Sequence, residues 1–193
     1  LALGWFDPGS VSYGAWIYTA ERTRVLGWEL ARGEIGFEVA LEGLLPVAPL
    51  ALDDSSLYLV ARAGSAGTRD ELVALDRGRS ALRWRRPLPR RGSEQPTGQG
   101  PVVSAGLVLF AAGTDLWAFD AERGGRRWVM RHFAPLAWPS VHGGTVAVLG
   151  DDGTLSAIDL DTGRVHWSYA TSDEHALAPR HWPGTARLGV THY

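Results

Sequence analysis

The pattern of apolar and polar residues between positions 155 and 167 predicts a β-hairpin. This stretch reads LSAIDLDTGRVHW, and its first half alternates with the period of two that is typical of a strand. The segment from Asp159 to Gly163 has turn chemistry, because Asp side chains accept hydrogen bonds from backbone N–H groups and Gly tolerates a positive φ. Val165 and Trp167 resume the alternation. We therefore expect two strands joined by a tight turn, with a large aromatic residue on the second strand.

The same hairpin pattern occurs four times along the chain. The stretches 72–84 (LVALDRGRSALRW) and 116–128 (LWAFDAERGGRRW) keep the spacing of 155–167, and 25–37 (VLGWELARGEIGF) is a weaker copy. The acidic residues of the four copies are separated by 47, 44 and 39 residues. Four-stranded propeller blades have a similar period, about 40–45 residues. The sequence therefore predicts an all-β fold, a β-propeller of four-stranded antiparallel blades.

An apolar run precedes each hairpin and completes the expected blade. The runs 57–60, 107–110 and 146–149 each follow a proline by several residues, and we assign them to an inner hairpin. Turn clusters at 113–115 and 150–153 separate the inner hairpin from the outer one. Residues 188–193 begin the same pattern after Pro183. We predict one propeller domain, or a fragment of one, across residues 1–193, with four repeats, a partial fifth and further blades in a larger ring.

The four hairpins share a motif of small, acidic, turn and aromatic residues, A-x-D-x-x-x-G-x-x-x-W. The matching residues are Ala74, Asp76, Trp84, Ala118, Asp120, Gly124, Trp128, Ala157, Asp159, Gly163 and Trp167. This motif resembles the repeat of the pyrroloquinoline-quinone-like (PQQ-like) β-propellers. That family includes quinoprotein dehydrogenases and BamB, a periplasmic subunit of the outer-membrane protein assembly machinery. The resemblance covers about residues 16–169 and implies the blade architecture.

The motif residues are interpreted as architectural. A tryptophan at the end of an outer strand can cover the next blade and bury about 150–250 Å², so Trp84, Trp128 and Trp167 are expected between blades. A ligand-stacking role is the alternative. The repeated aspartates are expected to bind backbone N–H groups at hairpin corners.

Composition and charge exclude several kinds of chemistry. The formal net charge is −2, so nucleic acid is not an expected partner. No apolar run reaches the ~18 residues of a transmembrane helix. Cys and Lys are absent, which excludes disulfides, thiolate metal sites and lysine-based catalysis. The six His residues show no metal-ligand spacing. We predict no catalytic, cofactor-binding or metal-binding residue.

Two groups of residues are candidates for binding a partner. Arg85, Arg86, Arg90 and Arg91 lie in an arginine-rich segment after the second hairpin and suit an acidic partner or anionic lipid head groups. A solvated outer strand is the alternative for these arginines. Trp138 and Trp182 lie in comparable connections before a blade's first strand, where binding sites often lie on a rim. These tryptophans have the alternative role of capping the blade core.

The resemblance implies three functions. The first is a non-catalytic scaffold that binds other proteins in a membrane-associated complex of the bacterial cell envelope, on its periplasmic or extracellular face. The second is a fragment of a PQQ-dependent quinoprotein dehydrogenase. Such enzymes would use an Asn calcium ligand and often a vicinal Cys pair, and this chain contains neither residue type. The third is the extracellular sensor domain of a membrane protein. Because open blade edges promote aggregation, we expect further blades or a partner to cover them.

Overall fold

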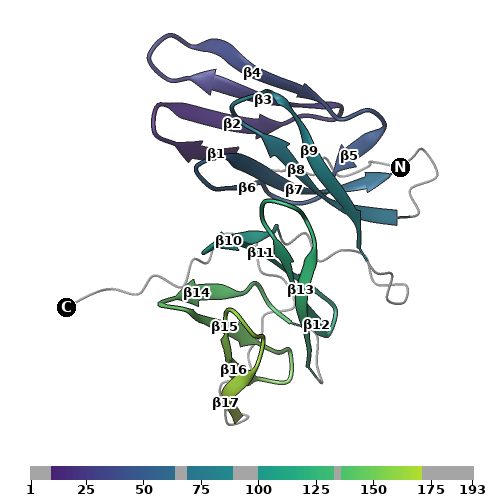
Figure 1. Cartoon of the computed structure of the whole chain (residues 1–193), viewed down its shortest axis with the longest axis vertical. Helices are drawn as coiled ribbons and strands as arrows, with labels where there is room; N and C mark the ends of the chain where they lie inside the picture. Colours follow the sequence, from purple (N-terminus) through teal and green to yellow (C-terminus); the bar gives the residue numbers. More distant parts are fainter. Residues whose placement is uncertain (1–9, 64–68, 89–99, 133–135, 171–193) are drawn as a thin grey trace.

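The computed structural model describes residues 10–63, 69–88, 100–132 and 136–170. These residues form β-strands joined by turns, with no helix among them. The strands make four antiparallel sheets that follow one another along the chain and are arranged like the blades of a fan (Figure 1). We number the sheets blades 1 to 4. The architecture confirms the predicted all-β propeller fold, and the predicted start of a fifth blade at 188–193 lies outside the described residues.

Each blade spans one repeat of the sequence. Blade 1 contains β1 (Ser10–Tyr13), β2 (Trp16–Ala20), β3 (Arg24–Glu29) and β4 (Glu34–Ala40). Blade 2 contains β5 (Leu44–Pro46), β6 (Ala51–Leu52), β7 (Ser56–Ala63), β8 (Arg69–Asp76) and β9 (Ala81–Pro87). Blade 3 contains β10 (Val102–Ser104), β11 (Leu107–Ala112), β12 (Asp115–Asp120) and β13 (Arg126–Arg131). Blade 4 contains β14 (Ser140–His142), β15 (Thr145–Leu149), β16 (Thr154–Asp159) and β17 (Val165–Ala170).

The strands of a blade pair in sequence order, from a short first strand to an outer fourth strand. Blade 2 differs because its first strand is broken: β5 and β6 both pair with β7, at opposite ends. β6 also contacts β1 and β10, so the first strands of neighbouring blades meet on the inner side. The predicted apolar runs form the second strands β7, β11 and β15. The fourth strands β4, β9, β13 and β17 therefore form the outer edges.

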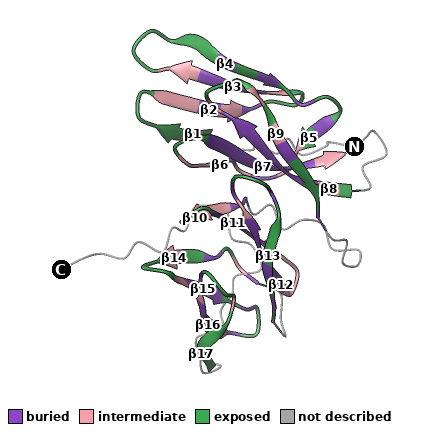
Figure 2. Cartoon of the chain, viewed as in Figure 1, coloured by how far each residue is buried: buried purple, intermediate pink, exposed green. Residues whose placement is uncertain are grey.

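Apolar side chains pack between successive blades. Tyr18 and Phe37 of blade 1 pack with Leu57 and Leu59 of blade 2 in one buried cluster. Two further clusters join blade 2 to blade 3 and blade 3 to blade 4. In blades 2 and 3 the second and third strands are buried on both faces, as their continuous apolar runs require (Figure 2). The core is thus a series of inter-blade layers.

The turn after the third strand is built by the acidic and glycine residues of the motif. In blade 3, Asp120 Oδ1 accepts hydrogen bonds from the N–H groups of Glu122 and Arg123, at 3.1 and 2.8 Å. The N–H of Gly124 donates to the Asp120 carbonyl at 2.8 Å, and Gly124 has φ +68°. Blade 4 repeats this turn with Asp159 and Gly163. The repeated aspartate therefore supplies acceptors for backbone donors that the turn leaves unpaired.

A β-bulge follows the turn in every blade. One residue of the outer strand lies opposite no partner, and it is the residue directly before the motif aromatic. In three blades this residue is basic and reaches the motif aspartate. The pairs are Arg83 with Asp76 (2.8 Å), Arg127 with Asp120 (3.8 Å) and His166 with Asp159 (3.7 Å). The bulge thus directs a basic side chain back to the turn.

The motif tryptophan of one blade contacts the turn of the next blade. Trp84 of blade 2 donates its indole N–H to the Ala121 carbonyl of blade 3 at 3.0 Å, and Trp128 of blade 3 donates to the Leu160 carbonyl of blade 4 at 2.9 Å. A Cβ atom added to Gly124 would lie 2.6 Å from the Trp84 ring. Each tryptophan therefore requires a glycine in the turn that it covers.

At the interface between blades 1 and 2, both the tryptophan and the glycine are replaced by other residues. Blade 1 carries Phe37 at the position of the tryptophan, and blade 2 carries Ser80 at the position of the glycine. Ser80 still adopts a left-handed conformation, with φ 51°. A side chain in the turn thus occurs where the opposing aromatic ring is the smaller one.

Three glycine substitutions separate backbone strain from steric overlap. Gly124→Ala should lower the free energy of unfolding by about 2–5 kcal/mol, the sum of a left-handed alanine and an overpacked contact. Gly106 has φ +74° and no atom within 4 Å of its added Cβ, so Gly106→Ala should cost about 1–2 kcal/mol. Gly125→Ala meets neither obstacle and should change stability little. Urea unfolding of the three variants measures these differences. Equal losses for Gly124→Ala and Gly106→Ala would contradict the predicted overlap with Trp84.

Trp84 and Trp167, the first and last motif tryptophans, should contribute differently to the stability of the fold. Trp84 is 7% exposed and Trp167 is 53% exposed. Trp84→Ala should therefore lower the free energy of unfolding by about 3–5 kcal/mol, and Trp167→Ala by less than about 1 kcal/mol. Thermal or urea unfolding of the 193-residue chain measures both. A large loss on substitution of Trp167 would show that it is covered.

The ion pair at Asp76 should make stability depend on pH. The Arg83 guanidinium holds the pKa of Asp76 below its ordinary value. The stability that this ion pair contributes is fully present above the unfolded pKa of Asp, about 3.9, and is lost as the pH falls through the lower pKa of the folded state. Asp76→Asn should cost about 1–2 kcal/mol at neutral pH, and its difference from the wild type should shrink below about pH 4. Urea unfolding at several pH values tests this, with the exposed Asp161→Asn as control. A pH-independent difference would contradict the assignment.

Candidate functional site

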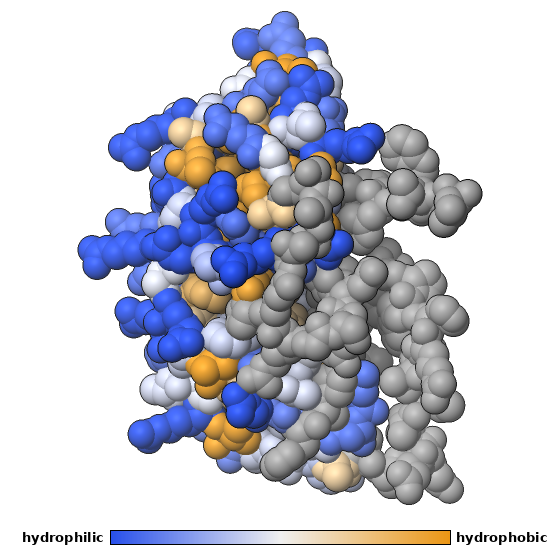
Figure 3. Space-filling view, turned by 90° about the vertical axis from the view of Figure 1, so that its right-hand side faces the viewer, coloured by the Kyte–Doolittle hydropathy of each residue, from blue (hydrophilic) through white to orange (hydrophobic). Residues whose placement is uncertain are grey.

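The outer strands of blades 2 and 3 form the most basic surface among the described residues. β9 carries Arg83, Arg85 and Arg86, β13 carries Arg126, Arg127 and Arg131, and neither strand contains an acidic residue. The outer strand of blade 1, β4, instead carries two glutamates and no arginine. Figure 3 shows strongly hydrophilic side chains projecting from one flank of the molecule, with smaller apolar areas between them. The outer strand is therefore acidic in blade 1 and basic in blades 2 and 3.

The described arginines of the predicted binding segment have different partners. Arg85 Nε lies 2.7 Å from Glu71 Oε2, so its charge is paired with a carboxylate of the neighbouring strand. Arg86 instead donates from Nε to the Gly124 carbonyl and from Nη2 to the Arg123 carbonyl, both at 2.9 Å. Arg86 therefore joins blade 2 to blade 3 through neutral acceptors. Arg90 and Arg91 lie outside the described residues, and their binding role stays a prediction.

Of the two predicted rim tryptophans, the structure describes Trp138. Its side chain is 45% exposed and precedes β14. The connection is fixed by the Ala137 N–H, which donates to the Leu149 carbonyl at 2.8 Å. Because the strands run up and down, Trp138 lies on the rim opposite the aspartate turns. Trp182 lies outside the described residues, so the structure does not bring the two tryptophans together.

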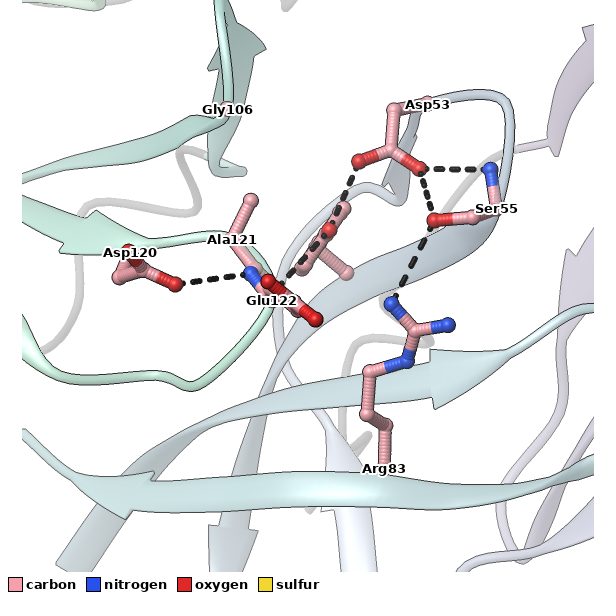
Figure 4. A pocket seen from close by; sticks show the side chains of 8 residues that line it. Asp53, Ser55, Arg83, Gly106, Asp120, Ala121 and Glu122 are labelled. Atoms are coloured by element: carbon pink, nitrogen blue, oxygen red, sulfur yellow. Dashed lines mark hydrogen bonds between the residues drawn. The ribbon is translucent and has the colours of Figure 1, made fainter.

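A shallow pocket of about 460 Å³ lies between blades 2 and 3 on the rim of the aspartate turns. Figure 4 shows Asp53, Ser55 and Arg83 on one side of it and Asp120 and Glu122 on the other. The sequence did not predict a pocket here, although one lining residue, Asp120, belongs to the predicted motif.

The polar groups of this pocket bind one another. Tyr58 donates to Asp53 Oδ2 at 2.8 Å and lies 3.2 Å from the Ala121 carbonyl of blade 3. Burial is the main cause that raises the pKa of the Tyr58 hydroxyl. Burial also opposes the ionisation of Asp53, but hydrogen bonds from Ser55, Tyr58 and Ser56 lower the pKa of Asp53 overall. The ionised Asp53 and the neutral Tyr58 thus tie the two blades together.

Blade 4 leaves uncovered the face that the earlier blades bury. Trp167 and Tyr169 on β17 are 53% and 63% exposed, whereas Trp128 and Met130, at the same positions of blade 3, are buried. Leu149 lies on the same face and is also exposed. Every residue of β17 is exposed (Figure 2). Among the described residues nothing covers this apolar face.

The described residues lack both a metal-ligand group and a membrane-spanning helix. They contain no group of three or more His, Cys, Asp or Glu side chains arranged to hold a metal ion. Within the same residues, no helix is long and apolar enough to span a membrane.

The contacts between the basic bulge residues and the motif aspartates were not predicted from the sequence, although the sequence contains a pattern that indicates them. A basic residue directly precedes the motif tryptophan in three repeats: Arg83, Arg127 and His166.

Solved structures show the same fold at low sequence identity. BamB from Moraxella catarrhalis superposes with a TM-score of 0.68 and 22% identity, covering 83% of this chain and 47% of that chain. Quinohemoprotein alcohol dehydrogenase from Comamonas testosteroni superposes with a TM-score of 0.63 and 18% identity, covering 84% of this chain and 35% of that chain. This chain thus spans about half, or less, of each of these propeller proteins.

Sequence comparison adds a longer relative and a family. The chain is 31% identical over 166 residues to the serine/threonine-protein kinase AfsK of Streptomyces griseus. The aligned region covers 79% of this chain and 18% of the kinase. A family model described as outer membrane protein assembly factor BamB matches residues 46–180. That match includes three of the four repeats and well over half of the chain. With its fold and its repeated motif in agreement, this protein belongs to the BamB family of PQQ-like β-propellers.

Proposed function

We propose that this chain is a non-catalytic propeller that binds other polypeptides as a scaffold subunit of a bacterial cell-envelope complex, on the periplasmic or extracellular face. The observation that carries the proposal is the uncovered face of blade 4. It presents Trp167 at the position where Trp84 and Trp128 each bind a neighbouring blade. An exposed apolar patch of this kind is a surface that another polypeptide or a further blade would cover. The cell-envelope location is supported by the family membership.

The motif residues support a scaffold because their polar groups serve internal contacts. The motif aspartates of blades 2 to 4 bind turn N–H groups and basic bulge residues. The indoles of Trp84 and Trp128 bind carbonyls of the next blade. These residues hold the blades in place, and the surfaces left for partners are the outer strands, the rims and the face of blade 4.

The alternative of a quinoprotein dehydrogenase fragment draws support from the fold alone. The similar dehydrogenase is 18% identical, and the chain spans 35% of its length. An Asn calcium ligand and a vicinal Cys pair would both have to come from outside these 193 residues.

A second candidate function is a sensor domain of a larger membrane protein. The specific observation in its favour is the 31% identity to a serine/threonine-protein kinase, of which the chain spans 18%. In that case the polypeptide bound by the propeller would transmit a signal to a linked domain.

Native mass spectrometry of the protein isolated from its source distinguishes these functions. The scaffold proposal predicts a cofactor-free chain that travels with other polypeptides at fixed stoichiometry. Titration of the purified protein with pyrroloquinoline quinone and Ca²⁺, followed by tryptophan fluorescence, is the matched control. We expect no saturable quenching.

Two outcomes would contradict the scaffold proposal. A quinone-sized adduct with bound calcium, together with alcohol oxidation, would favour the dehydrogenase. A chain several-fold heavier than 20.9 kDa that contains a kinase domain would favour the sensor.

A further inference from the structure

The arginines of β9 and β13 fall into two classes. Four of the six have a carboxylate partner on the neighbouring third strand or turn: Arg83 with Asp76, Arg85 with Glu71, Arg127 with Asp120 and Arg131 with Asp115. The other two are Arg86 and Arg126, and neither has a carboxylate partner among the described residues. Most arginines of β9 and β13 are therefore neutralised by a carboxylate of the described residues, and Arg86 and Arg126 are the two that are not.

The two uncompensated arginines lie at the same interface although they belong to different blades. Arg86 extends from blade 2 and binds the Arg123 and Gly124 carbonyls in the turn of blade 3. Arg126 begins β13 just after that turn, and its Cζ lies 5.7 Å from the centroid of the Trp117 ring. Trp117 packs in the apolar cluster between blades 2 and 3. The contact between blades 2 and 3 thus places two guanidinium groups, without a carboxylate partner in the described part of the chain, at the same interface.

Arg123 in the same turn adds a third positive charge. Its backbone carbonyl accepts the Arg86 hydrogen bond, and its side chain is exposed. The turn also contains two acidic residues. Asp120 pairs with Arg127, and Glu122 lines the pocket that also contains Arg83 (Figure 4). We call Arg86, Arg123 and Arg126 the blade 2–3 arginine cluster.

The fixed position of the cluster favours binding over mere solubility. Arg86 uses three of its five N–H groups on backbone carbonyls, so its fork is held in place with donors remaining. Arg126 is held over an aromatic face by a cation–π contact. A guanidinium whose position is fixed loses less entropy when it binds a carboxylate.

We propose that the blade 2–3 arginine cluster binds an acidic segment of a partner protein through at least two carboxylates. This inference rests on the proposed function and names the chemistry of the partner. A short segment fits better than an extended anionic surface, because β4 of blade 1 presents Glu34 on the outer edge beside Glu38, which is paired with Arg24. A membrane plane or a nucleic acid would have to meet those carboxylates too.

Fluorescence anisotropy with fluorescein-labelled hexaglutamate tests the proposal on the 193-residue chain. We expect binding at low salt that weakens strongly between about 20 and 150 mM NaCl. The double variant Arg123→Gln/Arg126→Gln should raise the dissociation constant roughly tenfold. The control Arg22→Gln/Arg32→Gln removes the same charge from exposed positions of blade 1 and should raise it less than about twofold.

Arg86 needs a milder change because it also joins two blades. Arg86→Lys keeps the charge and loses the planar fork, so we expect an increase in the dissociation constant of about threefold. Thermal unfolding of each variant identifies any loss of fold. Folded Arg123→Gln/Arg126→Gln protein that binds like the wild type would overturn the proposal.

Other outcomes separate this proposal from the proposed function. Equal weakening by both double variants would show a response to net charge and would overturn the cluster. Binding of phosphatidylserine vesicles with no binding of the peptide would replace the acidic segment with a membrane. In these cases a partner that still travels with the protein in native mass spectrometry leaves the scaffold function standing. Quinone-dependent oxidation would remove the scaffold function whatever the peptide does.

Discussion

The structure depends on one contact, in which an indole N–H of one blade meets a backbone carbonyl in the turn of the next. The contact needs a flat ring, an acceptor free to point at it and a turn with no side chain in the way. The motif supplies all three, because the aspartate binds the turn N–H groups and the glycine leaves room for the ring. This contact therefore holds blades 2, 3 and 4 together, while apolar packing that includes Phe37 joins blade 1 to blade 2.

The sequence predicted the blades because their motif has strong physical reasons for its spacing. The glycine four residues after the aspartate makes room for the tryptophan of the preceding blade, and the tryptophan eight residues after the aspartate covers the turn of the following blade. The short first strands were harder to predict, since three or four residues carry little periodicity. The break between β5 and β6 depends on contacts with β1 and β10, which come from distant parts of the chain.

The candidate binding residues were predictable in part. An arginine-rich segment is visible in the sequence, but the carboxylate that neutralises Arg85 is Glu71 on another strand. Likewise, the position before the motif tryptophan marks Arg83 and Arg127, but nothing in the sequence separates Arg86 and Arg126 from Arg85 and Arg131, which are paired. That difference arises only when two blades are packed together. The local sequence pattern thus identifies which strands are charged. Tertiary packing determines which of their charges have no partner within the fold and can bind another molecule.

Phe37 and Ser80 occupy the positions where the other blades have tryptophan and glycine. This difference makes the interface between blades 1 and 2 distinct from the other two interfaces. A tryptophan edge cannot cover the turn that contains Ser80 without displacing its side chain, whereas the edge that contains Phe37 would leave a gap over a glycine turn. Blades 1 and 2 are therefore matched to one another among units that otherwise look alike. During folding this mismatch would disfavour arrangements in which the repeats pair out of order. It also means that a blade duplicated or exchanged by recombination at this point would fit only if the residue facing it changed as well.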